Sequence, residues 1–187
     1  IAAMALQVNR EGVVSQILIW FNPILQSAPL VLLELLLVLP EESVNYHIDV
    51  DDDTRDRFAY QLTESFGDVA NFLTQQSSSP SCPVETKVKA MRCLGAWIES
   101  TFVGGSLVAS QPLFQTALGC LQSSDPDILE AAVDVVIATF QRFGSSNQDL
   151  LATCWPALLS MKTLWKEAVI KEDCEEGDPA SAVCRHV

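Results

Sequence analysis

Apolar and polar residues follow one another along most of the chain with the period of an α-helix. Between residues 55 and 76, apolar side chains recur every three or four positions and so form one stripe along a helix. These positions are Phe58, Leu62, Phe66, Val69 and Leu73. No stretch shows the alternation of β-branched and polar residues that is typical of a half-buried strand. The pattern therefore predicts an all-α protein.

Residues 30–39 depart from this pattern because Glu34 is the one charged residue in an otherwise apolar segment. The segment is too short to cross a bilayer, which takes about 20 residues in a helix. A helix that is apolar on every side is expected to be covered on every side. We therefore predict a buried helix that ends at Pro40, because proline lacks the N–H that would continue the helix.

Clusters of Pro, Gly, Ser and Asp divide the chain into about eight helical segments. We expect helices at 1–8, 12–21, 30–39, 55–76, 84–102, 113–122, 127–143 and 149–164. The second of these should break near Asn22 and Pro23, and residues 40–53 and 103–112 should be connecting segments. Asp53 or Thr54 is expected to cap the helix from 55, and Asp125 the helix from 127.

Consecutive helices pair across short turns about every 40 residues, which is the period of HEAT and armadillo repeats. The hairpins expected from this pairing span 1–21, 30–76, 84–122 and 127–164, and residues 165–187 add an acidic loop and the start of another helix. The predicted fold is an all-α HEAT-repeat solenoid of stacked antiparallel hairpins.

The chain begins inside a helical pattern without Met and ends where another helical pattern starts, so we expect it to be part of a longer array. Side chains such as Ile1, Met4 and Val183 should then be exposed at the two ends. We therefore predict that the chain on its own is only marginally stable.

The composition allows a packed core, because 49% of the residues are apolar. The net charge of −13 argues against nucleic acid, whose binding requires Lys and Arg to neutralise phosphates. It favours basic partners, although a well-solvated surface would have the same composition. The six cysteines include no CxxC pair, and we expect a reducing intracellular compartment and no membrane insertion.

The sequence contains no pattern typical of catalysis or of a bound cofactor. Gly-rich phosphate loops, GxSxG elbows and HExxH motifs are all missing. The acidic run 49–53 lacks the glycine and the terminal glutamate of an EF-hand loop, and His47 has no second ligand at a suitable spacing. We therefore expect no enzyme activity, no cofactor and no metal.

Four stretches occur in an order and at spacings that match one family. They are Leu-Glu-Leu-Leu-Leu-Val-Leu-Pro-Glu-Glu at 33–42, Arg-Cys-Leu-Gly-Ala-Trp at 92–97, Glu-Ala-Ala-Val-Asp at 130–134, and Trp-Lys-Glu-Ala-Val-Ile-Lys-Glu-Asp at 165–173 with the later pair Cys184 and Arg185. Together they resemble the transportin-SR branch of the importin-β superfamily, and the resemblance covers nearly the whole chain.

The resemblance implies a fragment from the N-terminal third of a nuclear transport receptor. Such a receptor binds Ran-GTP with its N-terminal repeats, carries protein cargo, contacts nucleoporins and shuttles between cytoplasm and nucleus. Cargoes of this branch include serine/arginine-rich splicing factors, whose positive charge suits an acidic solenoid. The alternative is a HEAT-repeat scaffold or adaptor that does not bind Ran.

In this family the second helix of each hairpin lines the inner surface of the solenoid. The resemblance therefore implies that a polar stripe of the helix 55–76 faces the partner. Its residues are Arg57, Gln61, Glu64, Asp68, Asn71 and Gln75. Glu64 and Asp68 lie one turn apart and are candidates to pair with a Lys or Arg of Ran. The other interpretation is an ordinary solvated helix face.

Tryptophans are frequent at protein interfaces, so Trp20, Trp155 and Trp165 are further candidate partner contacts. Trp97 lies within an apolar helical pattern, and we expect it in the core.

Overall fold

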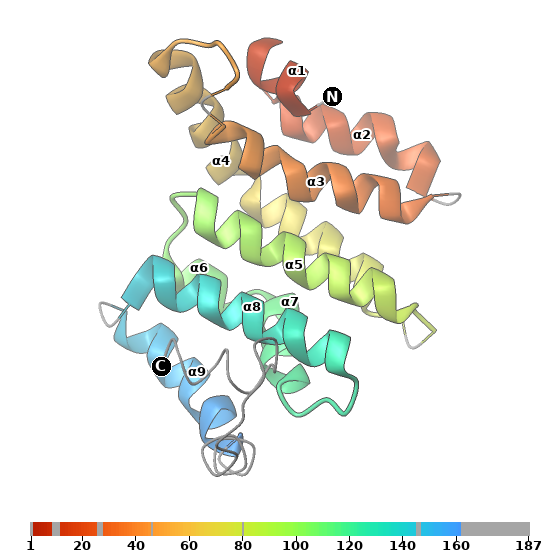
Figure 1. The fold of residues 1–187 in the computed structure, drawn as a ribbon, viewed down its shortest axis with the longest axis vertical. Coiled ribbons are helices and arrows are strands. Elements are labelled where there is room, and N and C mark those ends of the chain that lie inside the picture. Colours follow the sequence, from red (N-terminus) through yellow and green to blue (C-terminus); the bar gives the residue numbers. More distant parts are fainter. Residues whose placement is uncertain are drawn as a thin grey trace.

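The computed structural model describes residues 2–8, 12–25, 28–45, 47–79, 81–144 and 147–161. These ranges form helices α1 (Ala2–Val8), α2 (Val13–Leu25), α3 (Pro29–Ser43), α4 (Asp52–Ser77), α5 (Val84–Ser100), α6 (Gly105–Ala109), α7 (Pro112–Cys120), α8 (Pro126–Phe143) and α9 (Gln148–Ser160) (Figure 1). No strand occurs within these ranges, so the predicted all-α class is confirmed. Ile1, the predicted acidic loop, Trp165 and Val183 lie outside the described residues.

The helices stack as the solenoid prediction requires. Helices α3, α5 and α8 lie side by side, and α5 packs against both of its neighbours in this row (Figure 1). Behind them lie α4, which packs against α5, and α7, which packs against α8 (Figure 1). The two layers enclose a continuous core that runs through the described part of the chain.

The predicted apolar stripe of α4 is the part of this helix that enters the core. The exposed fraction of each side chain is 1% or less at Phe58, Leu62, Phe66, Val69 and Leu73. Phe58 and Phe66 are among the largest fully buried side chains, together with Trp97 of α5 and Phe114 of α7. The helical period thus identified the buried face of α4 correctly.

Pro40 does not end α3, contrary to the prediction, because a side chain from another helix replaces the missing backbone donor. Pro40 has no N–H for the carbonyl of Leu36, which lies four residues earlier. The indole Nε1–H of Trp97 donates to that carbonyl oxygen over 2.7 Å. Trp97 is fully buried, so the expectation that it belongs to the core is confirmed. The helix continues to Ser43, whose Oγ donates to the carbonyl of Pro40 over 2.6 Å.

Helix α3 is also not covered on every side, which corrects the second expectation for this segment. Leu32, Leu33, Leu36 and Leu39 are fully buried, whereas Val31 keeps 54% of its surface exposed. The neighbouring helices α1, α2, α4 and α5 pack around α3 but leave one side of it partly open.

The connection between α3 and α4 is shorter than predicted and is held by specific hydrogen bonds. The guanidinium of Arg55 donates to the carbonyl of Ser43 over 3.0 Å and to that of Ile48 over 2.7 Å. The N-cap of α4 is Asp51 rather than Asp53 or Thr54, since its carboxylate accepts from the Thr54 backbone N–H over 2.7 Å. Two further acids then lie in the first turn, where the helix dipole favours negative charge.

The prediction for the start of α8 is confirmed, because Asp125 is its N-cap. The Asp125 carboxylate accepts from the backbone N–H groups of Asp127 and Ile128.

Two other predicted boundaries are wrong. Helix α2 continues past Pro23 to Leu25, because a proline in the last turn removes only one backbone hydrogen bond. The segment 103–112 contains the short helix α6, which packs against α9. A Cβ on Gly105 would collide with the Asn147 side chain, which would have to move if Gly105 were replaced.

Candidate partner-binding surface

The six predicted site residues share one side of α4, turned away from its buried stripe. Gln61 is half-buried and the other five are exposed: Arg57, Glu64, Asp68, Asn71 and Gln75. A single helix of 26 residues therefore presents a long polar surface to solvent.

Charge along this surface is predominantly negative beyond the first turns of α4. Arg57 is held at the N-terminal end of the helix, where its Nε donates to the Asp53 carbonyl over 3.3 Å and its NH2 donates to the Thr54 Oγ1 over 3.2 Å. Within the described residues, neither Glu64 nor Asp68 has a Lys or Arg at ion-pair distance. Both carboxylates are therefore accessible to a basic side chain of another molecule.

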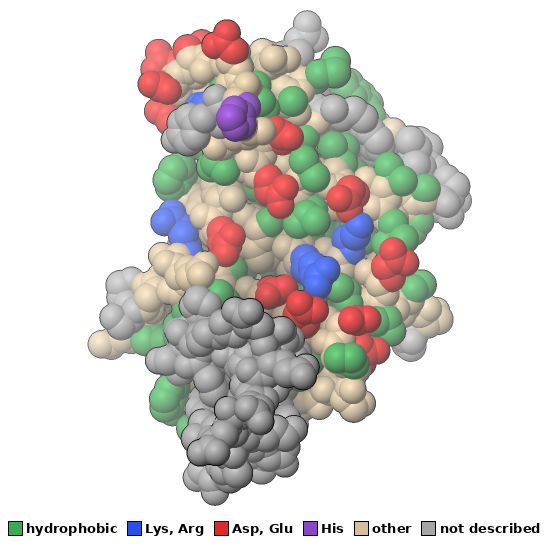
Figure 2. Space-filling model, viewed as in Figure 1, with side chains coloured by type: hydrophobic (Ala, Val, Ile, Leu, Met, Phe, Trp, Pro, Cys, Tyr) green, Lys and Arg blue, Asp and Glu red, His purple; other side chains and the backbone are tan. Residues whose placement is uncertain are grey.

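The acidic run before α4 is partly structural. Hydrogen bonds from the backbone and side chain of Thr54 lower the pKa of Asp51, because they favour its ionised form. Asp49, Asp52 and Asp53 are exposed. Acidic side chains gather where this segment leads into α4 (Figure 2). The run thus combines the cap of a helix with an exposed negative surface.

A second acidic surface lies between α3, α5 and α8, and sequence reasoning did not find it. A cleft of about 310 Å³ is lined by Glu41, Arg92, Glu99 and Asp134, with small and apolar side chains between them. The guanidinium of Arg92 lies 3.4 Å from Glu130 and 3.8 Å from Asp134. Acidic and basic side chains are interspersed over this layer (Figure 2).

Two carboxylates of this cleft have raised pKa values. Burial raises the pKa of Glu99, and the negative charge of Asp134 adds to the effect. Burial also raises the pKa of Asp134. The positive charge of Arg92 lowers this pKa, whereas the negative charge of Glu130 raises it. Glu99 and Asp134 come from different helices, and no spacing along the sequence indicates that they face each other.

The candidate tryptophans occupy different environments. Trp20 on α2 keeps 67% of its surface exposed and Trp155 on α9 keeps 53%. Both side chains are accessible to a partner, whereas the burial of Trp97 excludes it as a partner contact.

The described cysteines are free thiols rather than disulfides. Burial raises the pKa of Cys154 to about 11 and also raises that of Cys93, so neither thiol is reactive near neutral pH. Among the residues that the structure describes, no group of three or more His, Cys, Asp and Glu is placed to hold a metal ion.

None of the described helices combines the length and the apolar character needed to cross a bilayer.

The comparisons with known proteins agree with this architecture. The model of the family described as Exportin 1-like protein matches residues 1–136, from α1 into α8. Importin-13 of Gallus gallus is 27% identical over 157 residues, which are 83% of this chain and 15% of that protein. Transportin MOS14 of Arabidopsis thaliana is 26% identical over 156 residues, which are 82% of this chain and 16% of that protein.

The chain therefore spans only about one sixth of the length of these two relatives. The family match, in contrast, extends over well more than half of the chain itself. On this match and on the stacked helical fold, the chain belongs to the Exportin 1-like protein family, within the importin-β (karyopherin) superfamily.

Proposed function

We propose that this chain is part of a nuclear transport receptor of the transportin-SR branch, which binds Ran-GTP and carries basic protein cargo. The cargo would include serine/arginine-rich splicing factors, and the receptor would contact nucleoporins while it shuttles between cytoplasm and nucleus. The role is mechanical and electrostatic, without catalysis or a cofactor.

The observation that carries this proposal is the exposed polar side of α4. It presents Glu64 and Asp68 one turn apart, without an ion-pair partner among the described residues. Carboxylates at this spacing suit a Lys or Arg on a partner surface. The distribution of charge therefore favours a basic contact region of Ran.

The assignment to the transportin-SR branch rests on the sequence stretches described above. The stretches 33–42, 92–97 and 130–134 lie within residues 1–136 that match the family model. One of the two relatives carries the name transportin and the other importin. The stretch 92–97 includes Trp97, whose side chain donates to α3, so it has a structural role in this fold.

In this proposal, Ran-GTP and cargo act on one solenoid through different contacts. Each ligand stabilises the solenoid conformation that it binds best, and the coupling between the two sites is reciprocal. Binding of Ran-GTP therefore lowers the affinity for cargo when the two ligands favour different conformations.

The test is binding of the receptor to Ran loaded with GTP or with GDP. We expect tight binding to the GTP form only, weakened at least tenfold by Glu64→Lys combined with Asp68→Lys. The matched control is Glu85→Lys combined with Asp127→Lys, which changes the net charge equally at exposed sites in the first turns of α5 and α8. This control should bind like the unmodified protein.

Three results would contradict parts of the proposal. Nucleotide-specific binding that both double variants retain would keep the receptor function and reject the α4 site. Equal loss in both double variants would indicate a general effect of charge. A folded protein without nucleotide-dependent binding would instead be a HEAT-repeat scaffold.

A further inference from the structure

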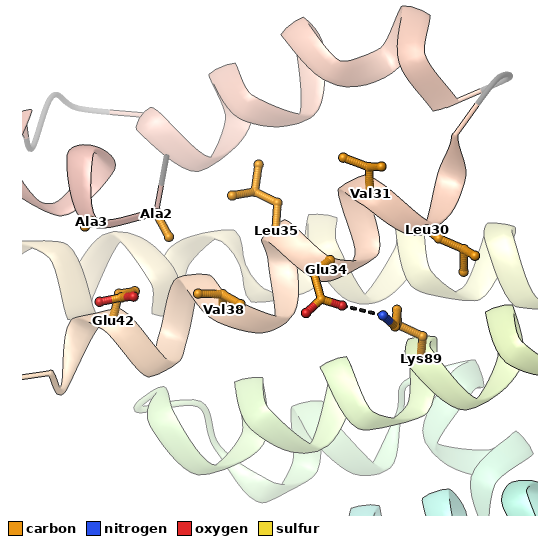
Figure 3. A pocket seen from close by; sticks show the side chains of 9 residues that line it. All are labelled: Ala2, Ala3, Leu30, Val31, Glu34, Leu35, Val38, Glu42 and Lys89. Atoms are coloured by element: carbon orange, nitrogen blue, oxygen red, sulfur yellow. Dashed lines mark hydrogen bonds and ion pairs between the residues drawn. The ribbon is translucent and has the colours of Figure 1, made fainter.

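The open side of α3 forms an apolar groove on the layer that also contains α5 and α8. Its volume is about 520 Å³, and α3 and α1 supply its apolar lining, which consists of Leu30, Val31, Leu35, Val38, Ala2 and Ala3. Figure 3 shows these side chains together with the three charged residues of the groove, Glu34, Glu42 and Lys89. Helix α3, which supplies most of the lining, lies in the other layer from α4 (Figure 1), and none of the lining residues belongs to α4, so the groove is separate from the proposed Ran contact.

The spacing of the apolar side chains in the groove suits the binding of a helix. Val31, Leu35 and Val38 follow one another at i, i+4 and i+7 and so form one ridge along α3. Val31 is 54% exposed, and the other two are half-buried. On the α1 side the lining consists of two alanines, whose small side chains allow another backbone to approach closely.

The one charge in the middle of the ridge is neutralised by a neighbouring helix. The Glu34 carboxylate forms an ion pair with the Lys89 ammonium of α5. In Figure 3, Glu34 points toward α5, whereas Val31 and Leu35 point away from it. The ion pair therefore keeps the carboxylate away from the apolar ridge.

The end of the groove near α1 is negatively charged. Glu42 accepts a hydrogen bond from the Asn45 amide over 2.9 Å, and no Lys or Arg of the described residues lies at ion-pair distance from it. Val31 and Glu42 are eleven positions apart on α3, which corresponds to about 16 Å along a helix axis. An occupant of about three helical turns would thus reach from the apolar ridge to this carboxylate.

We propose that the groove binds an amphipathic helix from another protein, with aliphatic side chains on one face and Lys or Arg at the end next to Glu42. The helix-in-groove mode fits the spacing of the ridge, and the basic end fits the carboxylate. A second copy of the chain, with its net charge of −13, and an anionic membrane are disfavoured by the same negative charge. This inference does not depend on Ran binding.

The probe is a fluorescent helical peptide of about 14 residues, with three leucines at i, i+4 and i+7 and two lysines one turn beyond them. Two versions carry the lysines at the N-terminal or the C-terminal end, because the orientation of the occupant is free. Control peptides replace the leucines by serine or the lysines by glutamate. Fluorescence anisotropy measures the Kd for the 187-residue chain and its variants.

We expect one of the two lysine peptides to bind. Val31→Gln should raise the Kd of that peptide at least tenfold. Val31 is largely exposed, so this change should leave the fold intact, which circular dichroism verifies. The matched control Val84→Gln alters an exposed valine at the start of α5 and should have no effect on the Kd. Glu42→Lys should weaken the lysine peptide and strengthen the glutamate peptide.

The proposal is overturned if neither lysine peptide binds at concentrations up to about 1 mM, or if Val31→Gln and Val84→Gln have the same effect. Sedimentation velocity tests for a second copy of the chain as the occupant, and flotation with anionic phospholipid vesicles tests for a membrane. Self-association or vesicle binding that Val31→Gln abolishes would assign the groove to a second copy or to a membrane, and would also overturn the proposal. The peptide test and the Ran test are independent. If the α4 variants lost binding of Ran-GTP, the results of the peptide test would not change.

Discussion

Trp97 is the residue that links the local chemistry of one helix to the packing of two. Pro40 leaves the Leu36 carbonyl without its ordinary intrahelical donor, and the buried indole N–H of Trp97 fills that position over 2.7 Å. A buried carbonyl without a donor costs about 1–3 kcal/mol, so this hydrogen bond stabilises α3 and its packing on α5. The helix thus continues through the Pro-Glu-Glu sequence after the leucines, and a residue far along the chain supplies the hydrogen bond that the proline lacks.

Trp97→Phe should therefore destabilise the protein more than the loss of ring volume alone explains. The comparison is made in a double-mutant cycle with Pro40→Ala, which restores a backbone N–H that can donate to the Leu36 carbonyl. We expect Trp97→Phe to cost about 1–3 kcal/mol less in the Pro40→Ala background than in the unmodified protein. Urea unfolding followed by circular dichroism measures all four proteins, and equal costs in both backgrounds would contradict the prediction.

Helices α5 and α8 form an interface that combines close apolar packing with acidic side chains at its edge. Arg92 of α5 lies near Glu130 and Asp134 of α8, while Glu99 of α5 and Glu41 of α3 bring further negative charge to the same cleft. Burial raises the pKa of both Glu99 and Asp134. The negative charge of Asp134 adds to the shift of Glu99, and that of Glu130 adds to the shift of Asp134. The folded protein therefore holds these protons more tightly than the unfolded chain does.

The sign of the resulting pH dependence follows from linkage. Where the native state binds more protons than the unfolded state, the free energy of unfolding falls as pH rises. For Glu99 this window begins near its ordinary pKa of 4.5 and extends upward. Above this window the carboxylate is ionised, and the negative charge of Asp134 opposes that ionisation.

Glu99→Gln should accordingly raise the free energy of unfolding at pH 7, by only roughly 0.5 kcal/mol because the side chain is partly accessible to solvent, which screens the repulsion. The gain should disappear below about pH 3, where glutamate is protonated in both states. Glu64→Gln on the exposed side of α4 is the matched control and should leave the stability at both pH values unchanged. A gain that persists at low pH would show that Glu99 acts through packing or helix propensity instead.

At the scale of the whole molecule, the described helices at the two ends leave apolar side chains exposed. Met4 on α1 is 64% exposed, as predicted, and α9 exposes Trp155 and Leu159 one turn apart. In a stacked array, each helical hairpin buries its apolar faces against its neighbours. The marginal stability expected of the isolated chain remains a prediction.

A pair of adjacent leucines on α9 tests how this helix is stabilised. Leu158 is 1% exposed and Leu159 is 49% exposed, so only the first contributes to the core of this chain. Leu158→Ala should lower the free energy of unfolding by about 2–5 kcal/mol, and Leu159→Ala by less than about 0.5 kcal/mol. Thermal unfolding of both variants makes the comparison, and similar losses would mean that the exposed face of α9 is covered in solution.

The sequence by itself determined the features that depend on neighbouring positions. The helical period identified the buried stripe from Phe58 to Leu73, and the residue preceding Pro126 was recognised as a cap. The exposed polar side of α4 was likewise predicted as a surface, because periodicity assigns the outward face together with the inward one. Its function as a contact for Ran remains a proposal.

Only the tertiary structure decided the features that join distant parts of the chain. In the folded protein, Trp97 supplies the hydrogen bond that Pro40 lacks within α3. Glu99 lies near Asp134, and the apolar ridge of α3 stays open beside two alanines of α1. Each of these depends on which helix lies next to which, and a periodic pattern carries no such information. The physical reason is that hydrogen bonding, desolvation and repulsion act between atoms close in space, whereas the hydrophobic period records only which side of each helix is turned inward.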